Sequence, residues 1–259
     1  MDLGIAGRNA IVCASSRGLG RACATALARA GARVAINGRD EARLLEVRDE
    51  IAAATGAEVV AVAGDISRED GRAAVLAAFG EVDILVNNNG GPPPKDFRAV
   101  DREAMIAGLE ANMIAPIQLI QAVIDGMVER RFGRIVNITS GSVKMPIAGL
   151  DLSSGARAGL TGFVAGIARS VAHANVTINN LLPGMFDTDR IAALVASQSR
   201  SSGRSADEIR AERQRAIPAK RFGDPEEFGA ACAFLCSAQA GYITGQSLLI
   251  DGGAFPGIM

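Results

Sequence analysis

The chain has 259 residues, 49% of them hydrophobic and 21% charged, which suits one large α/β domain with a sizeable core. Its formal net charge of −1 excludes the strongly basic surface typical of proteins that bind nucleic acid or anionic membranes. The four cysteines lack metal-ligand spacing and there is one histidine, so we expect no metal site and free thiols in a reducing cytoplasm. No run of about 18 apolar residues occurs, so we expect no membrane span.

Strands and helices are expected to alternate from one end of the chain to the other. Short apolar runs predict seven strands, at 9–14, 33–37, 58–63, 83–87, 133–139, 176–181 and 247–250. Helical patterns lie between them, at 18–30, 40–54, 67–79, 101–131, 152–173 and 225–236. This alternation implies right-handed βαβ units. It therefore predicts a doubly wound, seven-stranded parallel sheet with helices on both faces, in a single domain over residues 1–259.

Two local backbone features are also predicted. Ser67 is expected to cap the helix 67–79, with Asp70 three residues further on. Ala14, in the turn after the first strand, is expected to avoid positive φ, because only glycine adopts it at low cost.

The segment 184–224 is polar and charged, and it follows the end of a predicted strand. In doubly wound sheets, ligands bind beyond the carboxyl ends of the strands. The segment is therefore either a substrate lid or a solvated surface insert.

The turn between the first strand and the first helix is a candidate phosphate site. Small residues precede a helix N-terminus there, and such a turn offers backbone N–H groups and a positive dipole end to an anion. The stretch reads Val12-Cys13-Ala14-Ser15-Ser16-Arg17-Gly18-Leu19-Gly20. A glycine-rich turn alone is a weak signal.

Further motifs, in order and at matching spacing, make almost the whole chain resemble the short-chain dehydrogenases/reductases, nearest to the members similar to 3-oxoacyl-ACP reductase. Residues 13–20 align on that family's Thr-Gly-x-x-x-Gly-x-Gly turn, and 87–90 align on its Asn-Asn-Ala-Gly motif. Segments 183–188, 221–227 and 242–253 match its C-terminal motifs.

The resemblance implies the Rossmann version of the fold and a set of site residues. It implies that Asp65 meets the adenine, that Asn112 holds a catalytic water, and that Ser140 is the catalytic serine. The cofactor-binding residues that it implies are Ser15, Ser16, Arg17, Gly18, Leu19, Gly20, Arg39, Asp65, Ile66, Asn88, Asn89, Gly90, Arg157, Pro183, Gly184, Phe186 and Thr188.

The residues after the second strand favour NADP(H) over NAD(H). An NAD-specific site places a carboxylate there to bind the ribose 2′-hydroxyl, but this chain has Gly38. Arg39 follows, and Arg17 lies in the phosphate turn, so two guanidinium groups can bracket a 2′-phosphate. The alternative is that Arg39 is a solvated residue at a helix start.

The family's catalytic tyrosine and lysine have no counterpart in the aligned positions. Thirteen residues after Ser140 the chain has Ser153, and four further on it has Arg157. A serine hydroxyl is a far weaker acid than tyrosine, and arginine does not relay protons. Loss of a positioned acid or base costs roughly 10²–10⁴ in rate. Arg157 can still hold a ribose.

Other residues are candidates for the missing acid or base. Lys144 and Asp187 lie in loops over the expected site and are either acid–base groups or ordinary loop charges. Tyr242 and His173 are each the single residue of their type, and both are expected to have structural or surface roles.

Two functions remain open. The first is an NADP(H)-dependent short-chain oxidoreductase that interconverts a carbonyl and an alcohol, 3-oxoacyl groups included, at an atypical centre of Ser140, Ser153, Arg157 and Asn112. The second is an NADP(H)-binding protein of this fold without redox turnover, acting as a sensor, a partner subunit or a non-redox enzyme. By resemblance we expect a cytoplasmic homotetramer, assembled through the long apolar helices and the C-terminal residues 254–259, with a small-molecule substrate and no nucleic-acid or membrane partner.

Overall fold

The strands form one parallel sheet in the computed structural model, which describes residues 2–92 and 94–257. The sheet has seven strands in the order β3-β2-β1-β4-β5-β6-β7, and every pairing is parallel. The strands are β1 Asn9–Val12, β2 Arg33–Gly38, β3 Val59–Ala63, β4 Ile84–Asn87, β5 Gly133–Ile138, β6 Val176–Pro183 and β7 Ser247–Ile250. The doubly wound, seven-stranded parallel sheet predicted from the sequence is confirmed.

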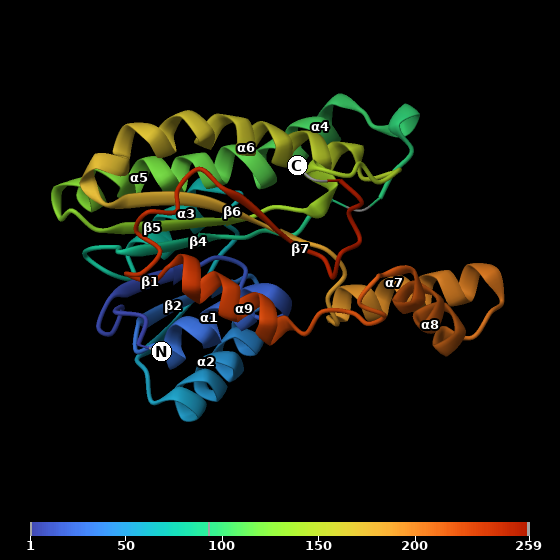
Figure 1. The fold of residues 1–259 in the computed structure, drawn as a ribbon, viewed down its shortest axis with the longest axis horizontal. Helices are drawn as coiled ribbons and strands as arrows, with labels where there is room; N and C mark the ends of the chain where they lie inside the picture. Colours follow the sequence, from blue (N-terminus) through green and yellow to red (C-terminus); the bar gives the residue numbers. More distant parts are fainter. Residues whose placement is uncertain (1, 93, 258–259) are drawn as a thin grey trace.

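Helices cover both faces of this sheet, as Figure 1 shows, with α5 and α6 on one side and α1, α2 and α9 on the other. The α-helices are α1 Gly18–Arg29, α2 Glu41–Thr55, α3 Glu69–Leu76, α4 Arg102–Leu109, α5 Ala115–Glu129, α6 Asp151–Val171, α7 Asp189–Ser202, α8 Ala206–Ala216 and α9 Pro225–Leu235. A π-helical turn, Glu110–Ile114, joins α4 to α5. Two apolar cores result, one on each face of the sheet.

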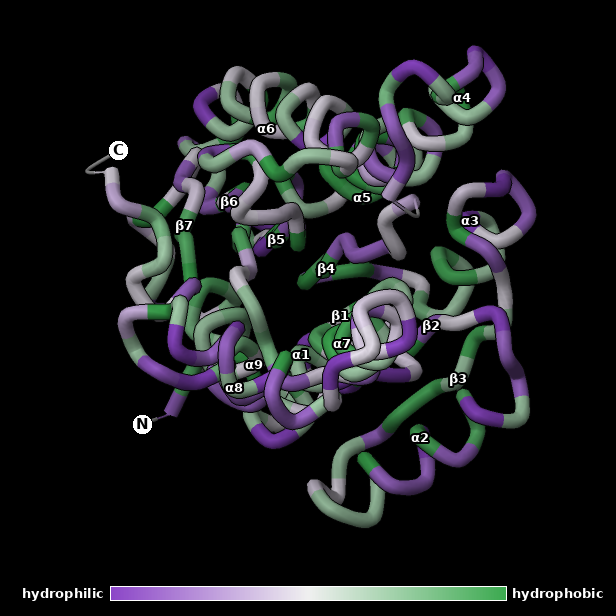
Figure 2. The backbone as a smooth tube through the Cα atoms, turned by 90° about the vertical axis from the view of Figure 1, so that its right-hand side faces the viewer, coloured by the Kyte–Doolittle hydropathy of each residue, from purple (hydrophilic) through white to green (hydrophobic). Residues whose placement is uncertain are grey.

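The sheet reverses its strand order between β1 and β4. Chain connections leave these two strands in opposite directions, and the crevice beyond their carboxyl ends is where such sheets bind ligands. In Figure 2, which looks from the right-hand side of Figure 1, α7 lies in front of the end of β1, just below β4 in the view. The fold therefore places the segment that follows β6 over the expected site.

Two local predictions were wrong. Helix α3 begins after Arg68, and the hydroxyl of Ser67 donates instead to the Asp65 carboxylate at 2.7 Å. Ala14 has a φ of 44°, in the left-handed region. Its backbone is held there because its amide donates to Asn37 Oδ1 and its carbonyl accepts from Asn88 Nδ2.

The polar segment 184–224 contains two helices, for which the sequence reading assigned none. Helices α7 and α8 form a pair that extends from the body of the domain (Figure 1). Each buries one hydrophobic side chain, Val195 in α7 and Ile209 in α8. Such sparse apolar spacing hides a helix from a reading based on hydrophobic periodicity.

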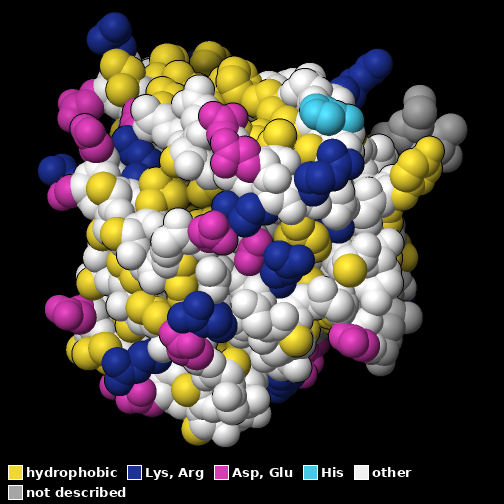
Figure 3. All heavy atoms as spheres, turned by 90° about the vertical axis from the view of Figure 1, so that its left-hand side faces the viewer, with side chains coloured by type: hydrophobic (Ala, Val, Ile, Leu, Met, Phe, Trp, Pro, Cys, Tyr) yellow, Lys and Arg dark blue, Asp and Glu magenta, His cyan; other side chains and the backbone are white. Residues whose placement is uncertain are grey.

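One helical stretch, Arg102–Glu129, is long and apolar enough by composition to cross a bilayer. Its α5 part buries Leu119, Ile120 and Val123 against the sheet, so core packing explains its apolar character. Figure 3 shows the face of the molecule that lies on the left-hand side of Figure 1. Acidic and basic side chains are interspersed on this face, in keeping with the net charge of −1.

Candidate functional site

The turn between β1 and α1 is fixed by contacts that leave no room for larger residues. A Cβ added to Gly20 would lie 2.4 Å from the Ala14 carbonyl oxygen and 2.7 Å from Asn88 Nδ2. The Ser15 hydroxyl donates to the Val12 carbonyl and accepts from the Asn37 amide. The backbone N–H of Ser15 also donates, to the Asn37 carbonyl at 2.7 Å, so Ser15 fixes the shape of the turn.

The N-terminus of α1 has the features of a pyrophosphate cradle. Its N-cap residue, Arg17, makes no side-chain capping bond, whereas Asp40 caps α2 and Asp224 caps α9. The first N–H groups of α1 are thus left for an anion, at the positive end of the helix dipole. Gly18 has a φ of +57°, which aims this backbone toward the crevice.

The segment after β6 meets this turn, although the two are far apart in sequence. Thr188 Cγ2 lies 3.8 Å from the position of a Cβ on Gly18. Pro183 ends β6, and Gly184 packs so closely on Asp251 that a Cβ would lie 2.6 Å from the Asp251 Cβ. The ring of Phe186 is buried edge-on against Phe228, 5.2 Å between centroids, so only its backbone can border a cofactor.

The residues predicted to bind the adenine and the 2′-phosphate lie at the far end of the crevice. Burial alone would raise the pKa of Asp65, but hydrogen bonds from Ser67 and the charge of nearby Arg39 lower it. Arg39 is exposed, and a side chain on Gly38 would contact Ser16 Oγ. Arg17 is mostly exposed and lies 4.0 Å from Asp40, so it remains free to turn toward a phosphate. Ile66 is buried in the core beside Asp65.

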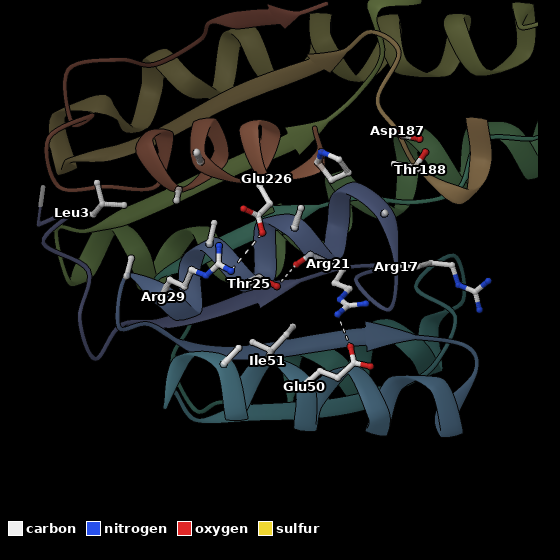
Figure 4. A pocket seen from close by; sticks show the side chains of 18 of the residues that line it. Leu3, Arg17, Arg21, Thr25, Arg29, Glu50, Ile51, Asp187, Thr188 and Glu226 are labelled. Carbon is white, nitrogen blue, oxygen red and sulfur yellow. Dashed lines mark hydrogen bonds and ion pairs between the residues drawn. The ribbon is translucent and has the colours of Figure 1, made fainter. Parts of the chain in front are cut away.

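A groove of about 1120 Å³ runs along α1, between α2 and α9, and at one end its lining includes Arg17, Gly18 and Thr188 of the candidate cofactor site. Figure 4 shows that Arg21 reaches Glu50 and Arg29 reaches Glu226 across it. These ion pairs connect α1 to its neighbours. We therefore assign the part of the groove that these ion pairs cross to helix packing, and the part beside Gly18 and Thr188 to the candidate cofactor site.

A cavity of about 440 Å³ runs from the adenine end to the start of α6. Its lining includes Arg39 and Asp65 at one end and Asn89, Gly90 and Ser153 at the other. The cavity therefore connects the predicted cofactor residues with the residue at the tyrosine position.

Ser153 and Arg157 form a hydrogen-bonded pair on one face of α6. Arg157 Nε donates to Ser153 Oγ at 3.2 Å, so the hydroxyl hydrogen of Ser153 is free to point into the cavity. The guanidinium also donates to the carbonyls of Ile138, at 2.7 Å, and Asn89, at 3.1 Å. Burial, with a smaller contribution from Arg190, lowers the pKa of Arg157 to about 10, so it stays protonated at neutral pH.

The remaining predicted polar groups lie on neighbouring elements. Ser140 follows β5, and its Oγ accepts from the Ser142 amide at 3.1 Å. Ser142 in turn accepts from the Ser154 hydroxyl, which draws Ser154 away from Ser153. Asn88 binds the Ala14 carbonyl, as described above.

Asn112 lies in the π-helical turn and is buried, and its Oδ1 has no hydrogen-bond partner within residues 2–92 and 94–257. Its Nδ2 makes a 3.4 Å contact with the Gly108 carbonyl. An unpaired buried acceptor is costly unless a water or ligand group reaches it. π-Helical turns often mark functional sites. Both observations fit the water-holding role that the resemblance implies.

The other candidate acids and bases are less well placed. Asp187 pairs with Arg210, Tyr242 is fully exposed, and His173 lies at the surface with its Nδ1 near the Ser170 carbonyl. Lys144 is half-buried and makes no side-chain hydrogen bond or ion pair within the part of the chain that the structure describes. Among the described residues, no group of three metal-ligating side chains occurs, and Cys13, Cys23, Cys232 and Cys236 are free and buried.

Sequence reasoning missed Arg190, near the start of α7. A Cβ on Gly91 would lie 3.6 Å from both terminal nitrogens of Arg190 and 3.3 Å from Ser153 Oγ. Nothing in the local sequence marks this arginine, because only the path of the chain after β6 brings it to Ser153.

Comparisons with known proteins establish the family. The family model for enoyl-(acyl carrier protein) reductases matches residues 13–254. This chain belongs to the short-chain dehydrogenase/reductase family. It is 35% identical to the 3-oxoacyl-[acyl-carrier-protein] reductase FabG of Vibrio cholerae over 257 residues, 98% of this chain and 99% of that protein. It is 34% identical to the NADPH-dependent reductase BacG of Bacillus subtilis, over 97% of this chain and 99% of that protein.

A solved member of the short-chain dehydrogenase/reductase family has nearly the same fold. L-Sorbose reductase from Gluconobacter frateurii, in complex with NADPH and L-sorbose, superposes with a TM-score of 0.95 at 28% identity, and the match covers all of both chains. The family relationship makes this chain an oxidoreductase by descent; of the relatives named here, BacG is described as NADPH-dependent and L-sorbose reductase was solved with NADPH.

Proposed function

We propose that the protein is an NADP(H)-dependent oxidoreductase that interconverts a carbonyl and an alcohol, with Ser153 and Arg157 in place of the family's tyrosine and lysine. The single observation that carries the proposal is the Ser153–Arg157 hydrogen bond, because it faces the cavity that also borders Arg39 and Asp65. Three observations support NADP(H) as the cofactor. They are the missing carboxylate at Gly38, the exposed Arg39, and the relatives that depend on NADPH or were solved with it.

The residues of the phosphate turn with Arg39 and Asp65 would hold NADPH, which would supply a hydride to the substrate carbon. The Ser153 hydroxyl donates a hydrogen bond to the substrate oxygen and keeps its proton. It accepts a hydrogen bond from Arg157, whose charge polarises the hydroxyl. Arg157 thereby stabilises the negative charge that develops on that oxygen. Ser140 is placed at the end of β5 as a second donor to the same oxygen.

The proton that completes the alcohol comes, in this proposal, from water. Asn112 Oδ1 is the acceptor that orients this water, since it is buried and unpaired among the described residues. Asn112 is connected to Arg157 through Ala111 and Asn89. Asn89 Nδ2 donates to the carbonyl of Ala111, the neighbour of Asn112, and the Asn89 carbonyl accepts from Arg157.

The alternative is a protein that binds NADP(H) without turnover. It is favoured by the interior contacts of Arg157 with Ile138 and Asn89, which resemble a structural lock. A purified sample separates the two functions. Binding of NADPH, followed by fluorescence, together with oxidation of NADPH on ketones, 3-oxoacyl thioesters or quinones supports the oxidoreductase. Binding without oxidation of NADPH on any of them supports the alternative.

Three further expectations belong to the same proposal. The segment 184–224 acts as the substrate lid, since α7 brings Arg190 to Ser153. The protein is a cytoplasmic homotetramer whose interface includes exposed apolar side chains of α4 and α6, such as Ile106 and Phe163. The predicted contribution of Ile258 and Met259 to a second contact lies outside the described residues. Light scattering that gives the mass of one chain would contradict the tetramer.

A further inference from the structure

Two arginines approach Ser153 from different elements. Arg157 reaches it from within α6. Arg190, in α7, borders the same space beside Gly91, since a Cβ on Gly91 would be 3.3 Å from Ser153 Oγ and 3.6 Å from both terminal nitrogens of Arg190. Gly91 and Ser153 both line the 440 Å³ cavity. The space beside Gly91 is thus bordered by a hydroxyl and a guanidinium.

Neither arginine has a carboxylate partner among the residues that the structure describes. Arg157 is 7% exposed, and its acceptors are two backbone carbonyls and a hydroxyl, all neutral. Arg190 makes no ion pair with the described carboxylates. Two like charges near each other, one of them buried, are unfavourable without a counter-ion.

Three of the acids near the site have other partners. Asp65 accepts from Ser67, Asp187 pairs with Arg210, and Asp101 lies 3.8 Å from Lys95. Arg190 therefore offers a guanidinium without an ion-pair partner among the described residues, beside Gly91, which lines the cavity together with Ser153. An anion bound there would be held by a guanidinium fork, the geometry that suits a carboxylate.

We propose that the substrate is a short 2-oxo or 3-oxo acid, whose carboxylate binds Arg190 while its oxo group faces Ser153. The proposal rests on the proposed function and names its substrate class. The oxo carbon gains a hydride from NADPH and its oxygen gains a proton from water, which yields the hydroxy acid and NADP⁺. The hydroxyl and the guanidinium both lie within 3.6 Å of one point beside Gly91, which favours a substrate whose oxo and carboxylate groups are adjacent or one carbon apart.

Matched pairs of probes that differ only in charge test the inference. Acetoacetate and phenylpyruvate, with their methyl esters, are titrated into the protein in the presence and absence of NADP⁺ and followed by calorimetry. In the wild-type protein each acid is expected to bind at least about tenfold more tightly than its ester, which corresponds to about 1.4 kcal/mol.

Three variants locate the effect. Arg190→Gln is expected to bring the affinity for the acid down to that of the ester and to leave the affinity for NADPH unchanged. Arg190→Lys should keep part of the preference, because it retains the charge without the fork. Arg200→Gln, an exposed arginine on the same helix, should behave as the wild-type protein does.

Several results would overturn the inference. They are equal affinity for acid and ester, no saturable binding of either acid at millimolar concentrations, or a loss of NADPH affinity in Arg190→Gln that shows this arginine to bind a cofactor phosphate. Failure of the proposed function is distinguishable, because selective binding of the acids with no oxidation of NADPH would leave the inference standing and contradict only the reductase.

Discussion

The phosphate turn at residues 13–20 and the start of α6 at residues 153–157 are the two halves of the candidate site, and they tolerate substitution very differently. The turn has Cys13 and Ala14 where the family has threonine and glycine, and it still forms a cradle. Ala14 adopts a φ of 44° because two asparagines hold its backbone. At α6, Ser153 and Arg157 keep the backbone frame, but they replace the groups that the resemblance assigns to proton transfer.

The difference follows from which atoms do the work. A pyrophosphate is bound by backbone N–H groups and a helix dipole, and most residue types provide these equally well whatever their side chain. Proton transfer needs a side chain of suitable pKa at one position. A family fold can therefore keep its cofactor site while its chemistry changes.

The largest expected effect comes from restoring the family's residues. The Ser153→Tyr/Arg157→Lys double variant should raise the rate of ketone reduction by roughly 10²–10⁴, the usual contribution of a positioned acid or base. Steady-state oxidation of NADPH measures it. The matched control is Ser154→Tyr/Arg157→Lys, since Ser154 bonds Ser142 instead of facing the cavity. Equal rates in both double variants would show that the α6 frame no longer fits the reaction.

The turn itself can be broken by one methyl group. Gly20→Ala places a Cβ 2.4 Å from the Ala14 carbonyl, so the backbone must shift. We expect the free energy of unfolding to fall by about 1–3 kcal/mol. The affinity for NADPH should fall at least about tenfold, equivalent to about 1.4 kcal/mol. Urea denaturation and fluorescence titration measure the two quantities.

Gly80→Ala is the control for that substitution, because no atom lies within 4 Å of its added Cβ. It should change neither quantity. Unchanged NADPH binding in Gly20→Ala would mean that the turn is not the phosphate site.

Cofactor selectivity should depend on Arg39, which is expected to bind the 2′-phosphate together with Arg17. Arg39→Ala should weaken NADPH binding by roughly 10–100-fold, the value of one or two charge-assisted hydrogen bonds, and leave NADH binding unchanged. Parallel titrations with both nucleotides measure this. Arg48→Ala, on the exposed side of α2 beside Asp49, is the control. A similar loss for both nucleotides would show that Arg39 does not read the 2′-phosphate.

The smallest expected effect concerns the ion pair between Arg221 and Glu227 at the start of α9. A hydrogen bond from Arg221, with a second from the Asp224 amide, lowers the pKa of Glu227 to about 2. The native carboxylate thus has a lower pKa than in the unfolded chain. Its stabilisation is present above its ordinary pKa of 4.5 and is lost as the pH falls toward about 2.

We therefore expect Glu227→Gln to lower the melting temperature slightly at pH 7, by an amount that shrinks on acidification. Differential scanning calorimetry across this pH range measures it. Arg221→Gln should show the same trend, because it breaks the same pair. A difference in melting temperature that does not vary with pH would place the effect in the α9 capping box and not in the charge.

The sequence predicted the fold well, because buried parallel strands are continuous apolar runs that alternate with helices. All seven strands and their parallel arrangement were anticipated. The errors were local. Ser67 forms a turn with Asp65 instead of a cap, and α7 and α8 went unassigned because each buries one hydrophobic side chain.

The sequence by itself determined the cofactor turn, the absence of a carboxylate at Gly38, and the presence of serine and arginine at residues 153 and 157. Only the tertiary structure decided what those residues touch. It aimed Arg157 at Ser153 and two carbonyls, left Asn112 Oδ1 without a partner among the described residues, and brought Arg190 to Gly91. The physical reason is that backbone recognition is encoded in a short local segment. The charge and hydrogen bonding of a cavity depend on residues that meet only when the sheet has assembled.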